Sequence, residues 1–412
     1  MTPVQPVRGT QSLLGEDADR LAAVVAAFDR VRRLFGFKRV EVPTIEPTQV
    51  FARTIGETTD VVSKEMYSFD DRGGDSITLR PEFTAGICRS FLSEGWQQHV
   101  PLKLATHGSA FRYERPQKGR FREFHQLDAE IIGAAEPQAD VEILSLGYQL
   151  LRELGIADGV TLELNTLGDP QTRDAWRSAL VDYFQSHRGG LSEDSVARLE
   201  RNPLRILDSK DERDRAICAD APSVDDYLTS EAADFFAAVI AGVDTVGVPW
   251  TRNARLVRGL DYYRHTAFEF VTDRLGAQGT VIAGGRYDGL IETLGGPHTP
   301  AIGWAAGIER LAMMIDAPPA ETLEVMIVLD DDRAQTAGAK VLAHLRARGL
   351  ASDIIATGSP RKRFDRAVKR GANEILILSV GDQRVTSRVK TSGEARAEAA
   401  MANFDWPLPD PA

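Results

Sequence analysis

The segment Glu123–Gly133 constrains the fold of this chain most, because polar and apolar residues alternate along it. In an extended strand, successive side chains point to opposite faces of the sheet. One face of this segment therefore carries Gln126, Asp128 and Glu130, and the other carries Leu127, Ala129 and Ile131. Antiparallel sheets tolerate one polar and one apolar face, whereas parallel sheets are usually buried on both. The segment predicts a strand of an antiparallel sheet.

The rest of the first 320 residues places helices and further strands around this sheet. Residues 16–35 carry apolar side chains at helical spacing on a charged background. Residues 169–248 are helical and charged in pattern, which indicates a helical insertion. Further along we expect the following elements: a strand from Leu102 to a turn at Gly108, strands over 255–272, a glycine-rich turn at Gly284 and Gly285, and a helix over 304–315.

Pro318 and Pro319 mark a linker, and the pattern changes beyond it. Strands and helices then alternate, with strands at 325–329, 354–356 and 375–378 and helices at 333–348 and 361–370. Such alternation predicts a small α/β domain with parallel strands. A chain of 412 residues also exceeds what one hydrophobic core usually supports. We therefore expect two domains, residues 1–320 and 321–412, and an α+β fold overall.

Composition excludes several classes of protein. The longest apolar run, Leu21–Phe28, has eight residues, whereas a membrane-spanning helix needs about 20. The first residues show no charged stretch followed by an apolar core, so no secretory signal is expected and the cytoplasm is the expected compartment. Cys88 and Cys218 are the only cysteines and lack the spacing of metal ligands. No metal site built by the protein alone is expected.

The net charge of −11 argues at first against a polyanionic partner. Salt screens exposed charges beyond about 8 Å, however, so charge has to be judged locally. Residues 361–370 hold six basic residues and a single acid, Asp365. A run of this kind is either a solvated helix face or a surface that binds nucleic acid, and composition alone leaves both interpretations open.

Common nucleotide-binding motifs are missing from the sequence. It has neither a G-x-x-x-x-G-K-[ST] loop nor a G-x-G-x-x-G turn, so neither a P-loop enzyme nor a dinucleotide-binding fold is indicated. The candidates for holding a nucleotide are Arg112 in Phe-Arg-Tyr-Glu, Arg258 in Arg-Gly-Leu-Asp-Tyr-Tyr, and Arg310 in Gly-Ile-Glu-Arg-Leu. An isolated arginine is usually a surface residue, so the motifs around these three have to carry the argument.

These motifs resemble those of one enzyme family. Residues 111–120, Phe-Arg-Tyr-Glu-Arg-Pro-Gln-Lys-Gly-Arg, resemble motif 2 of class II aminoacyl-tRNA synthetases, and residues 301–311 resemble motif 3. Residues 258–263 and 283–290 are similar to the two histidine-specific signatures of histidyl-tRNA synthetases. The segments 78–86 and 202–208 also match that family. The resemblance implies a class II catalytic domain, interrupted by the insertion, followed by an anticodon-binding domain.

The resemblance also implies roles for the arginines. Arg112 would hold the α-phosphate of ATP, Arg310 the γ-phosphate, and Arg258 both the histidine carboxylate and the α-phosphate. Glu114 and Arg120 would complete the ATP site, with Mg²⁺ accompanying the nucleotide. Negative charge gathers at phosphorus during adenylation, and arginine suits this role because its planar fork bonds two oxygens and stays charged.

The same family pattern implies a histidine pocket and further partners. Glu82, Thr84 and Gln126 would take the amino group and backbone of histidine, and Glu130 and Tyr263 its ring, with Tyr287 close by. A site built from paired hydrogen bonds rejects isosteres that cannot supply them. The resemblance further implies two partner contacts: Arg115 and Gln117 would bind histidine tRNA, and residues 37–43, which resemble motif 1, would form a homodimer interface. No membrane partner is expected. At Tyr113 the family frequently has histidine.

Two other functions have to be weighed against a synthetase. The regulatory subunit of ATP phosphoribosyltransferase shares the catalytic fold and binds histidine without aminoacylating tRNA. That paralogue typically lacks the C-terminal domain and the catalytic arginines, whereas this chain has Arg112, Arg258 and Arg310 and about 90 residues beyond Pro319. A general RNA-binding protein would explain the basic run but not the histidine signatures. The sequence therefore favours a histidine–tRNA ligase.

Overall fold

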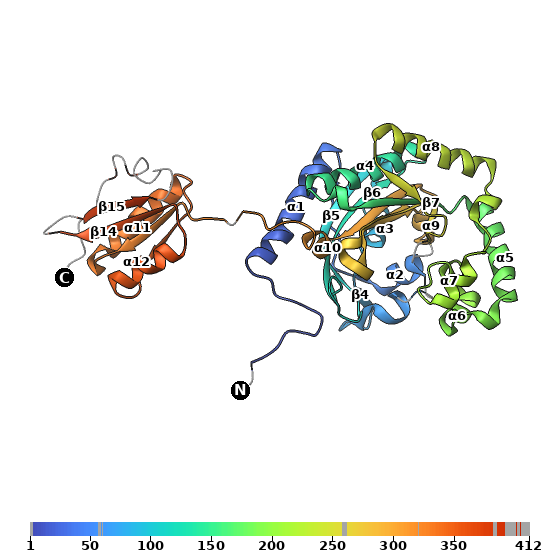
Figure 1. Cartoon of the computed structure of the whole chain (residues 1–412), viewed down its shortest axis with the longest axis horizontal. Coiled ribbons are helices and arrows are strands. Elements are labelled where there is room, and N and C mark those ends of the chain that lie inside the picture. The colour runs from blue at the N-terminus through green and yellow to red at the C-terminus, as the bar shows by residue number, and fades with distance from the viewer. Residues whose placement is uncertain are drawn as a thin grey trace. The chain divides into compact units, whose positions relative to one another are not determined.

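The computed structural model describes residues 3–56, 59, 61–257, 262–319, 321–381, 385–391, 401 and 404. The chain divides into two compact units, Met1–Pro318 and Pro319–Ala412, which we call unit 1 and unit 2 (Figure 1). Each unit has its own hydrophobic core and is described by itself.

An eight-stranded sheet forms the centre of unit 1. Across the sheet the strands follow the order β1 (Lys38–Arg39), β5 (Leu102–Phe111), β6 (Glu123–Ile132), β11 (Ala301–Gly307), β10 (Thr280–Arg286), β9 (Arg264–Val271), β7 (Thr161–Thr166) and β8 (Trp250–Arg252). The five inner pairings are antiparallel. The two outermost, β1 with β5 and β7 with β8, are parallel. The expected antiparallel sheet is confirmed for the part that contains β6.

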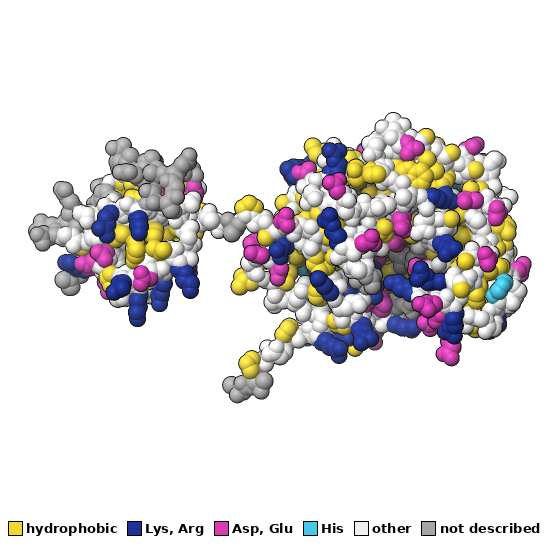
Figure 2. Space-filling view, viewed as in Figure 1, with side chains coloured by type: hydrophobic (Ala, Val, Ile, Leu, Met, Phe, Trp, Pro, Cys, Tyr) yellow, Lys and Arg dark blue, Asp and Glu magenta, His cyan; other side chains and the backbone are white. Residues whose placement is uncertain are grey.

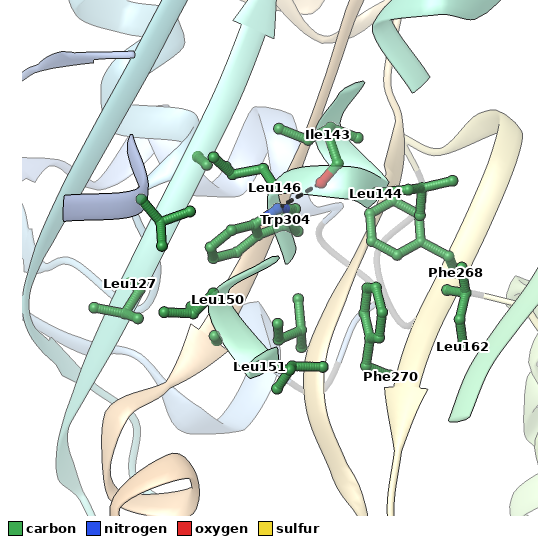
Figure 3. Close-up of a cluster of buried hydrophobic side chains, with 14 of the residues drawn as sticks. Leu127, Ile143, Leu144, Leu146, Leu150, Leu151, Leu162, Phe268, Phe270 and Trp304 are labelled. Atoms are coloured by element: carbon green, nitrogen blue, oxygen red, sulfur yellow. Dashed lines mark hydrogen bonds between the residues drawn. The ribbon is translucent and has the colours of Figure 1, made fainter. Parts of the chain in front are cut away.

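Helices α1 (Glu16–Leu34), α4 (Pro137–Glu153) and α8 (Ser230–Val246) contribute to the core on the apolar face of this sheet. Their buried side chains pack on Leu127, Ala129 and Ile131 of β6. Trp304 of β11 lies in the middle of this core, and its indole nitrogen donates to the carbonyl of Ile143 at 3.0 Å (Figure 3). Satisfying that N–H lets the large ring stay buried.

The other face carries the polar row of β6 and a second core. Helices α2 (Thr48–Ile55), α3 (Thr84–Ser93) and α9 (Leu290–Thr293) lie near a small antiparallel sheet of β2 (Ile45–Pro47), β4 (Ser76–Leu79) and β3 (Tyr67–Asp70). The polar row is buried, because Gln126, Asp128 and Glu130 are 9%, 0% and 1% exposed. Burying three polar side chains in a row is costly unless they have partners, which directs attention to this face.

The predicted helical insertion corresponds to α5 (Pro170–Ser186), α6 (Glu193–Arg201), α7 (Glu212–Cys218) and α8, which lie between β7 and β8 in the sequence. All four helices begin with a capping side chain: Asp169 accepts from the Thr172 N–H, Ser192 from Ser195, Asp211 from Arg213 and Thr229 from Ala232. No helix among the described residues is long and apolar enough to cross a membrane.

Three local predictions in unit 1 are wrong. Gly108 lies inside β5 rather than in a turn, Gly284 and Gly285 lie inside β10, and residues 304–307 belong to β11, so the helix that follows, α10, covers only Ile308–Ala312. The glycines of β10 are required by packing. A Cβ at Gly284 would overlap the carbonyl of Gly303, and one at Gly285 would lie 2.7 Å from the Tyr263 ring.

Unit 2 is a four-stranded sheet with a helix on each face. The strand order is β13 (Ser352–Ile355), β12 (Val325–Leu329), β14 (Glu374–Val380) and β15 (Val385–Thr391), with α11 (Gln335–Ala347) and α12 (Pro360–Lys369) between strands in the sequence. The first three strands are parallel, as expected, and β15 is antiparallel. All five residues of β12 are buried, because alternate ones pack towards α11 and towards α12.

Candidate active site

A cavity of about 500 Å³ opens on the polar face of the unit 1 sheet. Figure 2 shows the surface of the larger unit, where Lys and Arg side chains gather beside a hollow. The cavity is lined by residues from β6, β10, β11, α3, α10 and the hairpin after β5. Its charged side chains form two sets: carboxylates near the start of α3, and guanidinium groups around the hairpin.

Glu82 sits at the N-terminal end of α3. Its carboxylate accepts backbone hydrogen bonds from Thr84 at 2.7 Å and from Ala85 at 3.0 Å. These N–H groups belong to the first turn of the helix and have no intrahelical partner, so a carboxylate satisfies them well. Burial is the largest influence on Glu82 and raises its pKa, while the N–H groups and Arg112 act in the opposite direction.

Glu130 of β6 is held between two hydroxyl groups. Thr84 Oγ1 donates to one of its carboxylate oxygens at 2.6 Å, and the Tyr287 hydroxyl donates to the other at 2.5 Å. Burial raises the pKa of Glu130 to about 8, because the two hydroxyl bonds only partly offset the loss of water. The side chain is therefore a fixed group that is close to changing its protonation state near neutral pH.

The floor beside Glu130 is made of very small residues. In the pairing of β6 with β11, Gly303 lies opposite Glu130 and Ala305 opposite Asp128. In the next pairing, Gly285 of β10 lies opposite Gly303. A Cβ at Gly303 would overlap the Glu130 carboxylate. The glycine therefore makes the space in which Glu130 can lie flat over β11.

A buried ion pair holds the Tyr287 side of the cavity in place. Arg286, which is 0% exposed, pairs with Asp140 of α4, and its Nη1 also donates to the carbonyl of Ala134 at 2.9 Å. Asp288 accepts from Arg286 at 3.2 Å and from the Ala301 N–H at 3.0 Å. The flanking residues of Tyr287 are thus tied to the fold, which aims the tyrosine hydroxyl at Glu130.

The guanidinium groups line the cavity around the hairpin that follows β5. Arg112 Nε donates to the carbonyl of Pro81 at 2.9 Å, and Arg310 donates to the carbonyls of Gly119 at 3.2 Å and Thr280 at 2.8 Å. Glu114 pairs with Arg120 in the same group. Burial lowers the pKa of Arg310, with Arg120 the next largest cause. Arginines fixed through backbone carbonyls are preorganised to receive phosphate oxygens.

The structure brings together most residues named from the sequence. The cavity is lined by Glu82, Thr84, Arg112, Glu114, Arg120, Gln126, Tyr263, Tyr287 and Arg310, and Glu130 bonds two of them. Arg258 lies outside the described residues. Arg115 and Gln117 do not line the cavity. Gln117 exchanges two backbone hydrogen bonds with Arg120, which closes the tip of the hairpin.

The cavity lining also includes residues that the sequence did not single out as site residues, among them Phe124, Arg205, Tyr262 and Glu309. Glu309 accepts from the backbone N–H of His125 at 3.0 Å and lies 2.8 Å from His125 Nδ1, which raises the pKa of that histidine. Arg205 comes from the insertion, within the segment 202–208 that resembles the family. That resemblance was the available signal for Arg205.

The described residues form no group of three His, Cys, Asp or Glu side chains that could hold a metal ion. The combination of buried carboxylates and fixed guanidinium groups suits one ligand with cationic or hydrogen-bond-donating groups and another that carries phosphates.

Comparisons with known proteins agree with this chemistry. Residues 9–172 and 177–311 match the model of the family described as histidyl-tRNA synthetase. A histidine–tRNA ligase of Novosphingobium aromaticivorans is 60% identical over 410 residues, covering 97% of this chain and 98% of the relative. One from Gluconacetobacter diazotrophicus is 53% identical, covering 97% of each. The crystal structure of apo histidyl-tRNA synthetase from S. aureus superposes with a TM-score of 0.77 at 31% identity, covering 94% of this chain and 97% of that one.

Proposed function

The chain belongs to the histidyl-tRNA synthetase family, and we propose that the cavity of unit 1 is where it joins histidine to ATP and then to tRNA. It is a histidine–tRNA ligase, since ligases of the family match it over nearly its full length at up to 60% identity. That match favours the ligase over the regulatory subunit of ATP phosphoribosyltransferase. The assignments to single residues below are proposals.

The histidine ring binds at Glu130. The supporting observation is that Thr84 and Tyr287 each donate to one oxygen of a carboxylate that has no ion pair among the described residues. A ring N–H of histidine can donate to the remaining lone pairs of the Glu130 carboxylate. Tyr263 lies near this point, because the Tyr262 ring contacts both the Tyr263 ring and the Tyr287 ring. Glu82 and Gln126 take the ammonium end, because Gln126 Oε1 is buried and has no partner within the described structure.

ATP binds along the guanidinium groups. Arg112 receives the α-phosphate and Arg310 the γ-phosphate, while Glu114 and Arg120 border the nucleotide. Arg258 contacts the histidine carboxylate and the α-phosphate, which the family resemblance alone supports. The carboxylate oxygen of histidine attacks the α-phosphorus and pyrophosphate leaves, so charge grows where Arg112 lies. The terminal ribose hydroxyl of tRNA then attacks the carbonyl carbon of the adenylate, which forms the ester, breaks the acyl–phosphate bond and releases AMP and the hydroxyl proton.

Mg²⁺ fits this site as a companion of ATP. It usually takes one or two carboxylates and completes its shell with phosphate oxygens and water. Glu114 is the carboxylate beside the guanidinium groups that would hold it. When bound, the ion would neutralise charge on the phosphates.

The remaining partners are proposed on the family resemblance. Arg115 and Gln117 at the hairpin contact the acceptor end of histidine tRNA, and unit 2 binds its anticodon region. Residues 37–43, which resemble motif 1, form the interface of a homodimer. The cytoplasm is the proposed compartment, since tRNA charging supplies translation there.

Histidine-dependent exchange of pyrophosphate into ATP tests the proposal. The purified chain should catalyse the exchange, and Glu130→Gln should raise the KM for histidine far more than the KM for ATP, because the amide that replaces the carboxylate is a weaker, uncharged acceptor. Glu123→Gln is the matched control, because Glu123 lies on the same strand and does not line the cavity. Exchange that does not require histidine would contradict the proposal, and an unchanged histidine KM in Glu130→Gln would make Glu130 structural.

A further inference from the structure

Tyr113 is an exposed aromatic residue in the middle of the catalytic hairpin. Its neighbours in the sequence, Arg112 and Glu114, line the active-site cavity, and Tyr113 does not. Instead it lines a separate hollow of about 340 Å³ with Arg8, Arg115 and Pro116, among others. Its side chain remains 54% exposed.

Three contacts fix the orientation of the Tyr113 ring. Its backbone N–H donates to the carbonyl of Glu65 at 2.7 Å, and the Tyr67 ring meets it edge-on at 5.8 Å. The guanidinium of Arg122 lies 3.7 Å from the ring centroid and covers one face. With one face covered and more than half of the side chain exposed, the accessible part of the ring is its other face.

Arg122 is itself held against the chain. Its N–H donates to the carbonyl of Gly9 at 2.8 Å and its Nε to that of Glu114 at 3.3 Å. A Cβ at Gly9 would lie 2.7 Å from the Arg122 side chain, so the glycine allows the N-terminal segment to press against it. The ring and the guanidinium therefore form a rigid stack before any ligand arrives.

The hollow is strongly cationic although the chain as a whole is acidic. Arg8, Arg115 and Arg122 border it, and none of them forms an ion pair with a residue that the structure describes. Glu114 is the only acid in the lining, and its carboxylate pairs with Arg120. An open aromatic face ringed by arginines fits a nucleobase with its phosphate better than an acidic peptide, which would leave the ring unused.

We propose that the open face of Tyr113 stacks an unpaired nucleobase at the end of the tRNA acceptor stem, with Arg8 beside its phosphate. The site rests on the proposed function, because the 3′ hydroxyl of the tRNA has to enter the neighbouring cavity. Nucleotides next to that end then pass close to the hairpin, where Glu114 borders both spaces. Unpaired ends of RNA are commonly recognised by stacking on aromatic side chains.

Aminoacylation by Tyr113→Ala and Tyr113→Phe tests the site. Stacking needs the ring but not the hydroxyl, so Tyr113→Phe should charge tRNA like the parent. Tyr113→Ala should lose roughly 5- to 150-fold in kcat/KM for tRNA, the range typical of one stacked base. Pyrophosphate exchange without tRNA should be the same in all three proteins. A failure of the proposed function would appear separately, as a parent chain without histidine-dependent exchange.

Transcripts that lack one base identify the stacked nucleotide. An abasic nucleotide is placed at either the first or the second unpaired position on the 3′ side. At the stacked position, the abasic nucleotide should lower the kcat/KM of the parent for tRNA by about the same factor as the Tyr113→Ala substitution does. It should not lower the kcat/KM of the Tyr113→Ala variant any further. The proposal is overturned if neither position shows this coupling, if Tyr113→Phe loses as much as Tyr113→Ala, or if exchange falls together with charging.

Discussion

At the scale of single residues, Glu130 gives the site its pH dependence. Burial raises its pKa to about 8, whereas a glutamate in an unfolded chain titrates near 4.5. Between these values the folded state keeps a proton that the unfolded state has lost. The free energy of unfolding should therefore fall as the pH rises through this window, as far as Glu130 contributes to it.

Glu130→Gln removes this titration, so the variant should gain stability relative to the parent between about pH 5 and pH 8, by up to a few kcal/mol. Denaturant unfolding of both proteins across that range measures the difference. Glu212→Gln is the control, because Glu212 is exposed on α7. If the parent and Glu130→Gln respond to pH in parallel, Glu130 titrates as an ordinary carboxyl group.

A second prediction at the scale of single residues concerns Gly303 and the binding of histidine. A methyl group there would overlap the Glu130 carboxylate, which has to leave its bonds to Thr84 and Tyr287. Gly303→Ala should therefore weaken histidine binding by at least about tenfold, the effect of losing roughly one charged hydrogen bond. Titration calorimetry with histidine measures this. Gly289→Ala, where an added Cβ meets nothing within 4 Å, should bind histidine normally.

The sequence allowed the residues of the candidate site to be predicted, but not the contacts between its strands. Family motifs placed Glu82, Arg112 and Arg310 around one cavity, and the structure agrees with that placement. The need for glycine at 303 was not predictable, because it arises from the approach of β11 to a side chain on β6. Contacts of this kind join residues that are far apart in the sequence, so no local pattern records them.

At the scale of elements, the ion pair of Asp140 and Arg286 joins α4 to β10. Both side chains are fully buried, and removing one partner of such a pair leaves an uncompensated charge. Asp140→Asn should therefore destabilise the protein by about 3–5 kcal/mol in denaturant unfolding. It should also loosen Tyr287 and raise the KM for histidine.

Asp211→Asn is the matched comparison, since it breaks an ion pair with Arg213 at the surface. Exposed pairs contribute little, so its unfolding curve should match that of the parent. Equal effects of the two substitutions would mean that the pair of α4 and β10 does not hold the elements together.

Elements with a strong period were predicted correctly, and those rich in small residues were not. The apolar spacing of residues 16–35 gave α1, and the alternation along residues 123–133 gave β6. The strands β10 and β11 were misjudged because Ala283, Gly284 and Gly303 have neither the period nor the propensity of a strand. Small residues are needed here because the cavity lies above one face of the sheet, while Phe268 and Trp304 pack against the other face.

At the scale of the whole molecule, the proposed function assigns adenylation to unit 1 and binding of the anticodon region of the tRNA to unit 2. Unit 1 contains the complete described cavity, and unit 2 has its own core on each face of its sheet. A chain that ends at Pro318 should therefore keep histidine-dependent pyrophosphate exchange and lose most of its charging of tRNA. Measuring both reactions on the same preparation separates the two effects. Loss of both in a folded protein would mean that adenylation depends on unit 2.

The basic run 361–370 gives unit 2 a charged surface along α12, on which Figure 2 shows several Lys and Arg side chains. The structure divides the run into two groups. Arg363 is 5% exposed and pairs with Asp332, so it supports the fold and is not available to RNA. The other basic residues are exposed: Arg366 bonds Thr357 and Arg370 pairs with Asp353, whereas the side chains of Arg361, Lys362 and Lys369 make no hydrogen bond or ion pair with any residue described in the structure.

Neutralising Arg361, Lys362 and Lys369 together with glutamine should make the affinity for tRNA less dependent on salt. Each phosphate contact contributes about 0.7 to 0.9 to the slope of log affinity against log salt concentration, so the slope should become shallower by about 2 to 3. Filter binding from low to moderate salt gives both slopes. Lys340, exposed on α11 at the other face of the sheet, and Arg348, exposed at the C-cap of that helix, provide the control pair. An unchanged slope in the triple variant, or an equal change in the control, would return the run on α12 to a solvated helix face, because a surface that contacts phosphates has to release counterions when RNA binds.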